Sequence, residues 1–201
     1  MFKNKKILIG LITVLGAVFL SGCFGFGVSE AGRNFDTAII NYKWDGAIKG
    51  KETVYIDGEK TRSEIHTSTM IGGVETSQDR IIINDGTYLY KIDLVSNLAL
   101  KEESPYKAQL GELSPEEKHE LRKRLDLLLD EGEDFPESSG QEEIQGELCD
   151  VYNVTGESST CVWEGIVLRN EVVIDGGKAK QMAVSLENDV NLPENLFEIP
   201  T

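Results

Sequence analysis

The chain has 201 residues, with 20 lysines and arginines against 35 aspartates and glutamates, which gives a formal net charge of −15 at pH 7. Nucleic acid and anionic lipid headgroups both repel a chain this acidic, so nucleic-acid binding is excluded. Hydrophobic residues make up 40% of the sequence, enough to fold, and the length suits a single domain.

The N-terminus has the three parts of a secretory signal peptide. Lysines occupy positions 3, 5 and 6, and an uncharged apolar run follows over residues 7–20. As a helix this run would span roughly 21 Å, which is short of a hydrocarbon core of roughly 30 Å. The run therefore favours a signal peptide over residues 1–22, with an uncleaved membrane anchor as the alternative.

The four residues Leu20-Ser21-Gly22-Cys23 resemble the lipobox of prokaryotic lipoproteins. The resemblance implies that Cys23 carries a diacylglycerol and becomes the first residue of the mature protein, with residues 23–34 as a tether. The protein is then expected to be extracytoplasmic and anchored to a membrane through Cys23. Removing residues 1–22 removes three lysines and no acids, which leaves 17 basic residues against 35 acidic ones, a net charge of −18.

Two cysteines remain, Cys149 and Cys161. An even number of cysteines outside the cytoplasm indicates a disulfide. Their flanking sequences read as two strands joined by a turn near Gly156, which would place the two thiols nearly opposite each other. A metal site is the competing interpretation, but no histidine lies nearby at ligand spacing.

The rest of the chain from residue 35 reads mostly as β-strands. Ala38, Ile40, Tyr42 and Trp44 alternate with more polar residues, as in a half-buried strand. Asp-Gly and Gly-Gly pairs, which suit tight hairpin turns, separate further β-rich stretches. The expected strands cover residues 49–56, 59–70, 74–84, 87–92, 98–101, 146–154, 159–165, 166–174 and 179–186, about ten antiparallel strands in all.

One helix is expected between these strands. Ser114-Pro115-Glu116-Glu117 resembles a capping box, and an apolar leucine stripe follows it. The acidic segment over residues 126–147 is interpreted as a surface loop. One helix of about 16 residues spans roughly 24 Å and cannot cover ten strands. The sheet therefore either curls on itself or leaves an apolar concavity, and the sequence alone leaves both open.

The residue types that carry catalysis are sparse. His66 and His119 have no cysteine or second histidine at metal-ligand spacing. The chain has no Gly-x-Ser-x-Gly elbow and no phosphate-binding glycine loop. We therefore expect no catalytic residues, no metal, no cofactor and no enzymatic activity.

The C-terminal segment from Cys161 carries a resemblance to a known family. Six positions match: Trp163, Gly165, Leu168, Arg169, Phe197 and Pro200. On these residues the chain resembles the LolA/LolB-like lipoprotein-carrier superfamily, which includes lipid-anchored proteins of the LppX and LprG type. The resemblance implies a mainly β (α+β) fold, a strongly curved antiparallel half-barrel over residues 35–201 with a helical lid, whose concave face holds acyl chains.

Two classes of function are left open. The first is a membrane-anchored protein that binds an acyl chain or another apolar ligand, with lipid or a lipoprotein as its partner. The second is a sensor or envelope-assembly interaction module whose interior is only a filled core. The residues expected to line the ligand site are Ile40, Tyr42, Trp44, Tyr88, Tyr90, Met182 and Val184. In the second class, the same residues are ordinary core.

Overall fold

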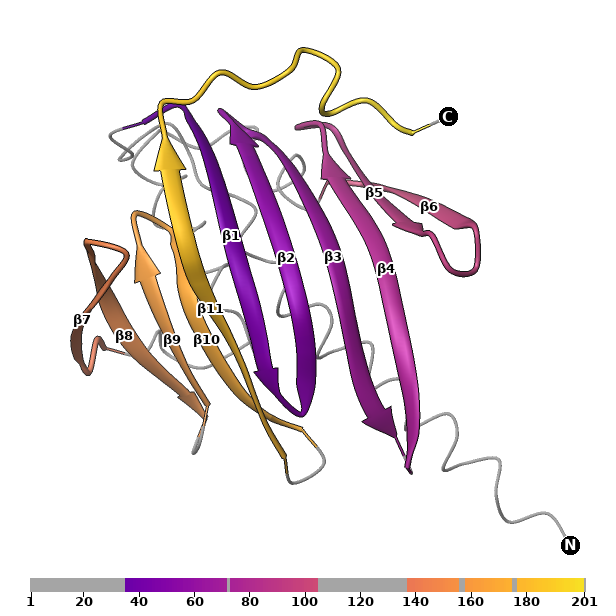
Figure 1. Ribbon diagram of the computed structural model, residues 1–201. Coiled ribbons are helices and arrows are strands. Elements are labelled where there is room, and N and C mark those ends of the chain that lie inside the picture. The colour runs from indigo at the N-terminus through magenta and orange to yellow at the C-terminus, as the bar shows by residue number, and fades with distance from the viewer. Residues whose placement is uncertain (1–34, 72, 105–136, 156–157, 175–176, 201) are drawn as a thin grey trace, which may run out of the picture.

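The computed structural model describes residues 35–71, 73–104, 137–155, 158–174 and 177–200 (Figure 1). Within these ranges the chain forms one antiparallel sheet of eleven strands. The strands are β1 (Thr37–Gly46), β2 (Ile48–Asp57), β3 (Lys60–Ile71), β4 (Val74–Asn84), β5 (Tyr88–Asp93), β6 (Leu98–Glu103), β7 (Gly140–Ile144), β8 (Glu147–Thr155), β9 (Ser158–Trp163), β10 (Ile166–Ile174) and β11 (Gly177–Asn188).

The order of the strands is β6-β5-β4-β3-β2-β1-β11-β10-β9-β8-β7. Two meanders, β1 to β6 and β7 to β11, are therefore joined where the first strand pairs with the last. The terminal strands β6 and β7 each pair with a single neighbour, so the sheet is open (Figure 1). The pairing of β1 with β11 is the long-range contact that unites the two halves.

The expectation of a mainly antiparallel β protein is confirmed, and the predicted hairpins lie where the turn residues place them. The helical lid is unsupported, because the residues that the structure describes contain no helix. The helix expected from residue 114, the signal peptide and the tether lie outside the described residues. One expectation is wrong: the acidic segment does not stay a loop throughout, because its end forms β7.

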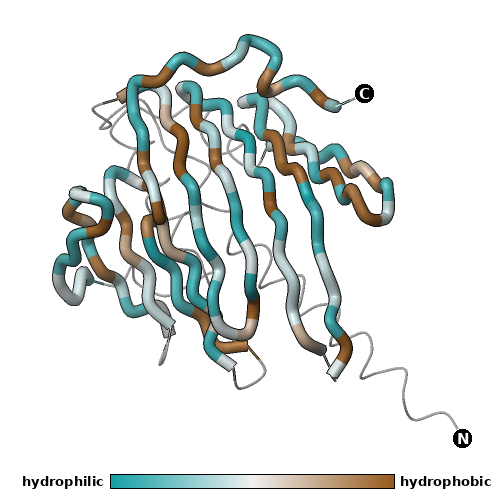
Figure 2. The backbone as a smooth tube through the Cα atoms, viewed as in Figure 1, coloured by the Kyte–Doolittle hydropathy of each residue, from teal (hydrophilic) through white to brown (hydrophobic). Residues whose placement is uncertain are grey.

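The two faces of the sheet differ in burial along β1. Ala38, Ile40, Tyr42 and Trp44 are buried, and the side chains between them are half-buried or exposed. We call the face that carries these four residues the inner face and the opposite one the outer face. Figure 2 shows the same alternation of apolar and polar residues along neighbouring strands. Since directly paired residues of adjacent strands share a face, the register assigns every residue of β2 to β6 to one of the two.

Two bulges interrupt this alternation. One lies where β1 meets β11, between Asn41 and Tyr42, and leaves Val184 without a partner. The other lies where β10 meets β9, between Val167 and Arg169. A bulge inserts one extra residue and bends its strand, so the face pattern on one side of it cannot be extended to the other.

The main hydrophobic core lies on the inner face. It brings together residues of β1, β2, β8, β9, β10 and β11, among them Ile40, Val54, Ile56, Ile166 and Leu168. Just before β1, Phe35 stacks on Trp163 at 5.2 Å between ring centroids and closes one end of this core.

No helix among the described residues is long and apolar enough to span a bilayer.

The segment after β11 crosses one end of the sheet near β1 to β4 (Figure 1). The hydroxyl of Thr37 donates to the carbonyl of Val190 at 2.7 Å, and the guanidinium of Arg62 donates to the carbonyl of Leu196 at 2.9 Å. Arg62 lies on the outer face, directly opposite Ile83, which is fully buried. The C-terminal segment is therefore tied to the sheet by contacts far apart in the sequence.

Candidate functional site: a carboxylate buried on the inner face

The predicted disulfide is present. Cys149 on β8 and Cys161 on β9 are joined, with their Cα atoms 5.5 Å apart, and both are fully buried in the main core. Cys161 pairs directly with Val151, so the bridge runs diagonally across the hairpin. It connects two strands that are already neighbours, which makes its role structural.

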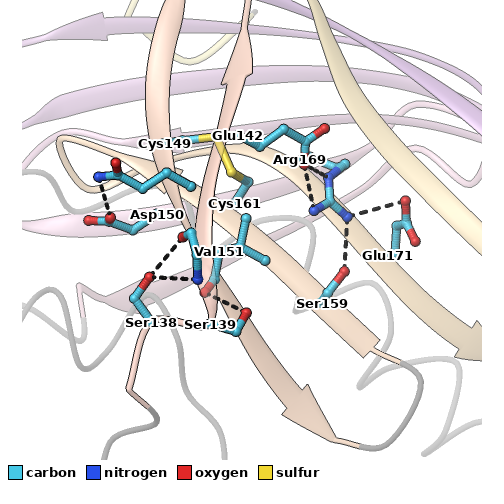
Figure 3. The surroundings of a disulfide bond; sticks show 12 residues. Ser138, Ser139, Glu142, Cys149, Asp150, Val151, Ser159, Cys161, Arg169 and Glu171 are labelled. Atoms are coloured by element: carbon cyan, nitrogen blue, oxygen red, sulfur yellow. Dashed lines mark hydrogen bonds and ion pairs between the residues drawn. A yellow bond between two sulfur atoms is a disulfide. The ribbon is translucent and has the colours of Figure 1, made fainter.

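Arg169 lies beside the disulfide and holds three strands together (Figure 3). Its side chain donates to Glu142 of β7 and to Ser159 of β9, both at 2.9 Å, and forms an ion pair with Glu171 of its own strand at 3.2 Å. Arg169 is almost fully buried, and these partners offset the free-energy cost of removing its charge from water. This position of the LolA-like resemblance thus has a structural role.

Three of the expected ligand-lining residues, Ile40, Tyr42 and Trp44, do lie together on the inner face. Tyr42 and Trp44 are 5% and 6% exposed to solvent and Ile40 is not exposed at all, so all three are sealed from solvent. The hydroxyl of Tyr42 reaches across β11 to donate to the carbonyl of Val167 at 2.9 Å. Ala183, directly opposite Tyr42, is small enough to let the ring pass over its strand.

Tyr88 and Tyr90 do not join this set, which corrects the expectation. Tyr90 pairs with Ile83, and Ile83 pairs with Arg62, which places all three on the outer face. Tyr88 lies two residues before Tyr90 in the same strand and therefore faces the same side of the sheet. The ammonium of Lys101 lies 3.6 Å from the centre of the Tyr88 ring, so this aromatic pair contacts a cation on the outer face.

The expectation is also wrong for Met182 and Val184. Met182 pairs with Lys43 and is therefore on the outer face, where it is 36% exposed. Val184 is the unpartnered residue of the bulge and is 46% exposed. Only Leu186, beyond the bulge, returns to the inner face opposite Ile40. The bulge breaks the period of two that would have put these three side chains together.

The inner face instead carries an acidic residue, Glu52, that is 1% exposed. It lies on β2, directly opposite Tyr42 of β1 and Ile65 of β3. Three donors reach its carboxylate: the Ser63 hydroxyl at 2.5 Å, the Gln181 amide at 2.7 Å and the Trp44 indole at 3.4 Å. The first bonds Oε1 and the other two bond Oε2, so Oε1 keeps capacity for another donor.

Burial dominates the electrostatics of this group. Loss of solvent raises the pKa of Glu52 to about 7, even though the hydrogen bonds from Ser63, Trp44 and Gln181 act to lower it. The pKa of Tyr42 is also raised, first by its own burial and then by the nearby negative charge of Glu52. At neutral pH, Glu52 therefore exists as both the acid and the carboxylate.

Glu52 lies two residues from a row of directly paired residues that crosses eight strands; six of the eight are buried, Gln78 is half-buried and Gly50 is exposed. The register connects them in sequence, each directly opposite the next: Tyr152, Thr160, Asn170, Gln181, Trp44, Gly50, Thr67 and Gln78. We call this set the polar row. Within it the Thr160 hydroxyl donates to the Asn170 amide oxygen at 3.1 Å. On β11, β1, β2 and β3 the row shares the inner face with Glu52, with the Gln181 amide on one side of Trp44 and Gly50 and the Thr67 hydroxyl on the other.

Two members of the polar row have special features. Gly50 has φ +146°, and a Cβ placed there would lie 2.1 Å from the backbone oxygen of His66, so only glycine fits. Gln78 has a buried side-chain oxygen, Oε1, with no hydrogen-bond partner among the described residues.

The sequence itself contains a signal for this site. Glu52 is in phase with Ile48, Val54 and Ile56, and Gln181 is in phase with Ala179 and Ala183. A charged or amide side chain at an apolar position of a period-two strand indicates a buried polar site.

No cluster of three or more histidine, cysteine, aspartate or glutamate residues suited to a metal occurs among the residues described.

The fold and site define a single-sheet antiparallel β protein with a polar site buried on one face. No protein-family model matches the chain, and no curated protein matches its sequence. Among solved structures the chain is similar to one titled as the complex of Pseudomonas aeruginosa MucA/MucB, at 10% identity and a TM-score of 0.37. The match covers 90% of this chain and 61% of that one. At this TM-score, no conclusion about function follows.

Proposed function

We propose that the chain is a non-enzymatic, membrane-anchored extracytoplasmic protein that binds an acyl chain or another apolar ligand against the inner face of its sheet. The observation that carries the proposal is Glu52, a carboxyl group buried on an apolar face. An apolar residue there would cost nothing in desolvation, whereas a buried carboxyl group does. Ionisable groups with strongly shifted pKa values cluster at functional sites, which favours a binding role for this position.

Two further observations support the location and the anchor. The disulfide between Cys149 and Cys161 fits an oxidising compartment outside the cytoplasm. The signal peptide and Cys23 would supply the membrane attachment, as their resemblance to a lipobox implies. Because Ile40, Tyr42 and Trp44 are sealed from solvent, the inner face would have to open when a ligand enters.

That same burial favours a second candidate, an interaction module with a filled core. The polar tips of Tyr42 and Trp44 already have partners within the chain, at Val167 and Glu52. In a ligand-binding site, by contrast, the polar atoms of Tyr42 and Trp44 could form hydrogen bonds to the ligand instead of to the protein. Under this alternative, no apolar compound would enter the inner face.

A neutral fluorescent probe separates the two candidates. We expect N-phenyl-1-naphthylamine to bind the full chain at micromolar concentration, because Ile40, Val54 and Ile56 form part of an apolar cluster on the inner face. Val54→Thr adds a hydroxyl to that surface without changing its volume, and burying this group against the probe should weaken binding by about fivefold or more. The readout is a fluorescence titration of the probe.

The matched control is Val173→Thr, the same change at a position 41% exposed. It should leave the affinity for the probe unchanged. If the wild-type chain binds no probe at micromolar concentration, the ligand-binding proposal fails and the interaction module replaces it. If both variants weaken binding equally, the probe is not bound at the inner face.

A further inference from the structure

The two edges of the open sheet differ in how they are protected against pairing with a further strand. The edge strand β7 has two glutamates in five residues, and one of them, Glu142, is held by Arg169 at 2.8 Å. The large apolar side chain of β7, Ile144, is buried. Charged side chains on an edge strand discourage pairing with further strands. The first half of the other edge strand, β6, has no such protection, because it reads Leu98-Ala99-Leu100.

Large apolar side chains are exposed along β6 and in the turn before it. Leu98 and Leu100 are 68% and 60% exposed, and Leu94 and Val95 of the turn are exposed as well. The hairpin of β5 and β6 lies at one side of the sheet and contributes no residue to the main core (Figure 1). A group of exposed apolar side chains of this kind marks an interaction surface.

The backbone of β6 also has groups that point away from the sheet. In an antiparallel pair, directly opposite residues alternate between those that exchange backbone hydrogen bonds and those that do not. The Ser104 amide donates to the carbonyl of Thr87 at 3.0 Å, in the register that pairs β6 with β5. The even-numbered residues of β6 therefore bond to β5. The odd-numbered ones point their amides and carbonyls to the free edge, and they are Ala99, Lys101 and Glu103.

The hydrogen bonds of β5 to its other neighbour, β4, agree with this assignment. The Leu94 amide donates to the Asp79 carbonyl at 2.8 Å, and the Asp85 amide donates to the Tyr88 carbonyl at 3.1 Å. In the register of β4 with β5, these two bonds direct the backbone groups of the even-numbered residues of β5 to β4. Those residues are the direct partners of the odd-numbered residues of β6. Among the described strands, β6 pairs with β5 alone.

The side chains of β6 determine which strand would fit beside it. Leu98, Leu100 and Glu102 lie on one face, and Glu103 is exposed on the other. Directly opposite side chains of neighbouring strands contact each other, so apolar residues fit opposite the leucines and basic residues fit opposite the glutamates. The net charge of −15 also favours a basic partner and disfavours a second copy of the chain.

We propose that β6 is a docking site for an extended segment of another protein, which adds to the sheet as an antiparallel strand. The segment has basic residues opposite Glu103 and Glu102, followed by apolar residues opposite Leu100 and Leu98. Backbone hydrogen bonds give such an added strand its affinity, and the alternate side chains give it specificity. The surface is separate from the inner face of β1 and β2, so the inference does not depend on ligand binding there.

The blocked peptide acetyl-Lys-Lys-Thr-Ile-Thr-Val-amide has this pattern and serves as the probe. The control peptide, acetyl-Glu-Glu-Thr-Ile-Thr-Val-amide, has the same apolar residues and the opposite charge. NMR titration of the isotope-labelled full chain gives both affinities. We expect the basic peptide to bind at submillimolar concentration and the acidic one to bind about tenfold more weakly or less, because like charges would then lie opposite Glu102 and Glu103.

Two variants at one position test the backbone contribution. Lys101→Pro removes an outward donor without removing a hydrogen bond to β5, and an edge strand tolerates proline where its amide faces solvent. It should weaken binding of the basic peptide by about tenfold or more. Lys101→Thr is the matched control, because it also loses the ammonium group near the Tyr88 ring but keeps the amide. It should bind the peptide at least as tightly as the wild type.

Amide hydrogen exchange of the wild-type chain reads out the strand addition itself. The outward amides of Ala99, Lys101 and Glu103 should exchange rapidly in the free chain and about tenfold or more slowly at saturating peptide. This result decides the matter even if Lys101→Pro does not fold. The inference is overturned if these amides are already slow in the free chain, or if the peptide does not slow them.

Three other results would also overturn it. The first is equal binding of the basic and acidic peptides. The second is equal binding of the basic peptide by folded Lys101→Pro and Lys101→Thr. The third is a dimer of the full chain that Lys101→Pro dissociates, because the strand beside β6 would then belong to a second copy.

Discussion

Replacing both Cys149 and Cys161 by alanine is expected to lower the free energy of unfolding by about 3 kcal/mol. The two cysteines are 12 positions apart, and closing a loop of this size restricts the unfolded chain by that amount in the chain-entropy model. Both side chains are fully buried, so the loss of core packing adds to the effect. Urea unfolding of the wild-type and variant chains measures the difference.

The reductant dependence of unfolding provides the control for this effect. The wild-type chain should unfold at lower urea in the presence of a reductant, and the double alanine variant should not respond to it. A difference below about 1 kcal/mol between the oxidised wild-type chain and the variant would contradict the role we assign to the bridge. So would a wild-type chain whose unfolding is indifferent to reductant.

The second large effect is a pH dependence that belongs to Glu52. A glutamate has a pKa of 4.5 without such burial, and burial raises that of Glu52 to about 7 in the native state. Between these two values the native state holds a proton that the unfolded state has lost. The contribution of this group to stability is therefore full below pH 4.5 and is lost as the pH rises through 7, by roughly 3 kcal/mol.

Comparison with Glu52→Gln isolates that contribution. The free energy of unfolding of the variant minus that of the wild type should rise by roughly 3 kcal/mol between pH 4.5 and pH 8. Asp85, Asp93 and Glu171 have lowered pKa values, so their contributions are lost at acidic pH, equally in both chains. A difference for Glu52→Gln that stays flat over this pH range would mean that Glu52 is not buried as an acid.

The local elements of the fold follow from the sequence. Period-two alternation and Asp-Gly or Gly-Gly turns predict hairpins whose partners are adjacent in the chain, and these are confirmed. The disulfide was predictable for the same reason, since Cys149 and Cys161 lie on one hairpin. The pairing of β1 with β11 was not predictable, because no local feature of the sequence indicates which strands pair when they are 130 residues or more apart.

The candidate site was only partly predictable, because faces depend on register. Along β4, Ile81, Ile82 and Ile83 are all buried, so the sequence has no alternation there to show which face the next hairpin presents. Tyr88 and Tyr90 were assigned to the wrong face for that reason. Met182 was misplaced because the bulge at Val184 shifts the phase within a single strand.

Mass spectrometry of one full-chain preparation, purified without added lipid, under native and then denaturing conditions tests ligand binding on the inner face most directly. The denatured chain should start at Cys23 and carry a diacylglyceryl adduct there. The native mass should exceed the denatured mass by that of one bound compound with an apolar chain. Equal native and denatured masses, from a chain shown to be folded, would contradict the binding of a ligand on the inner face.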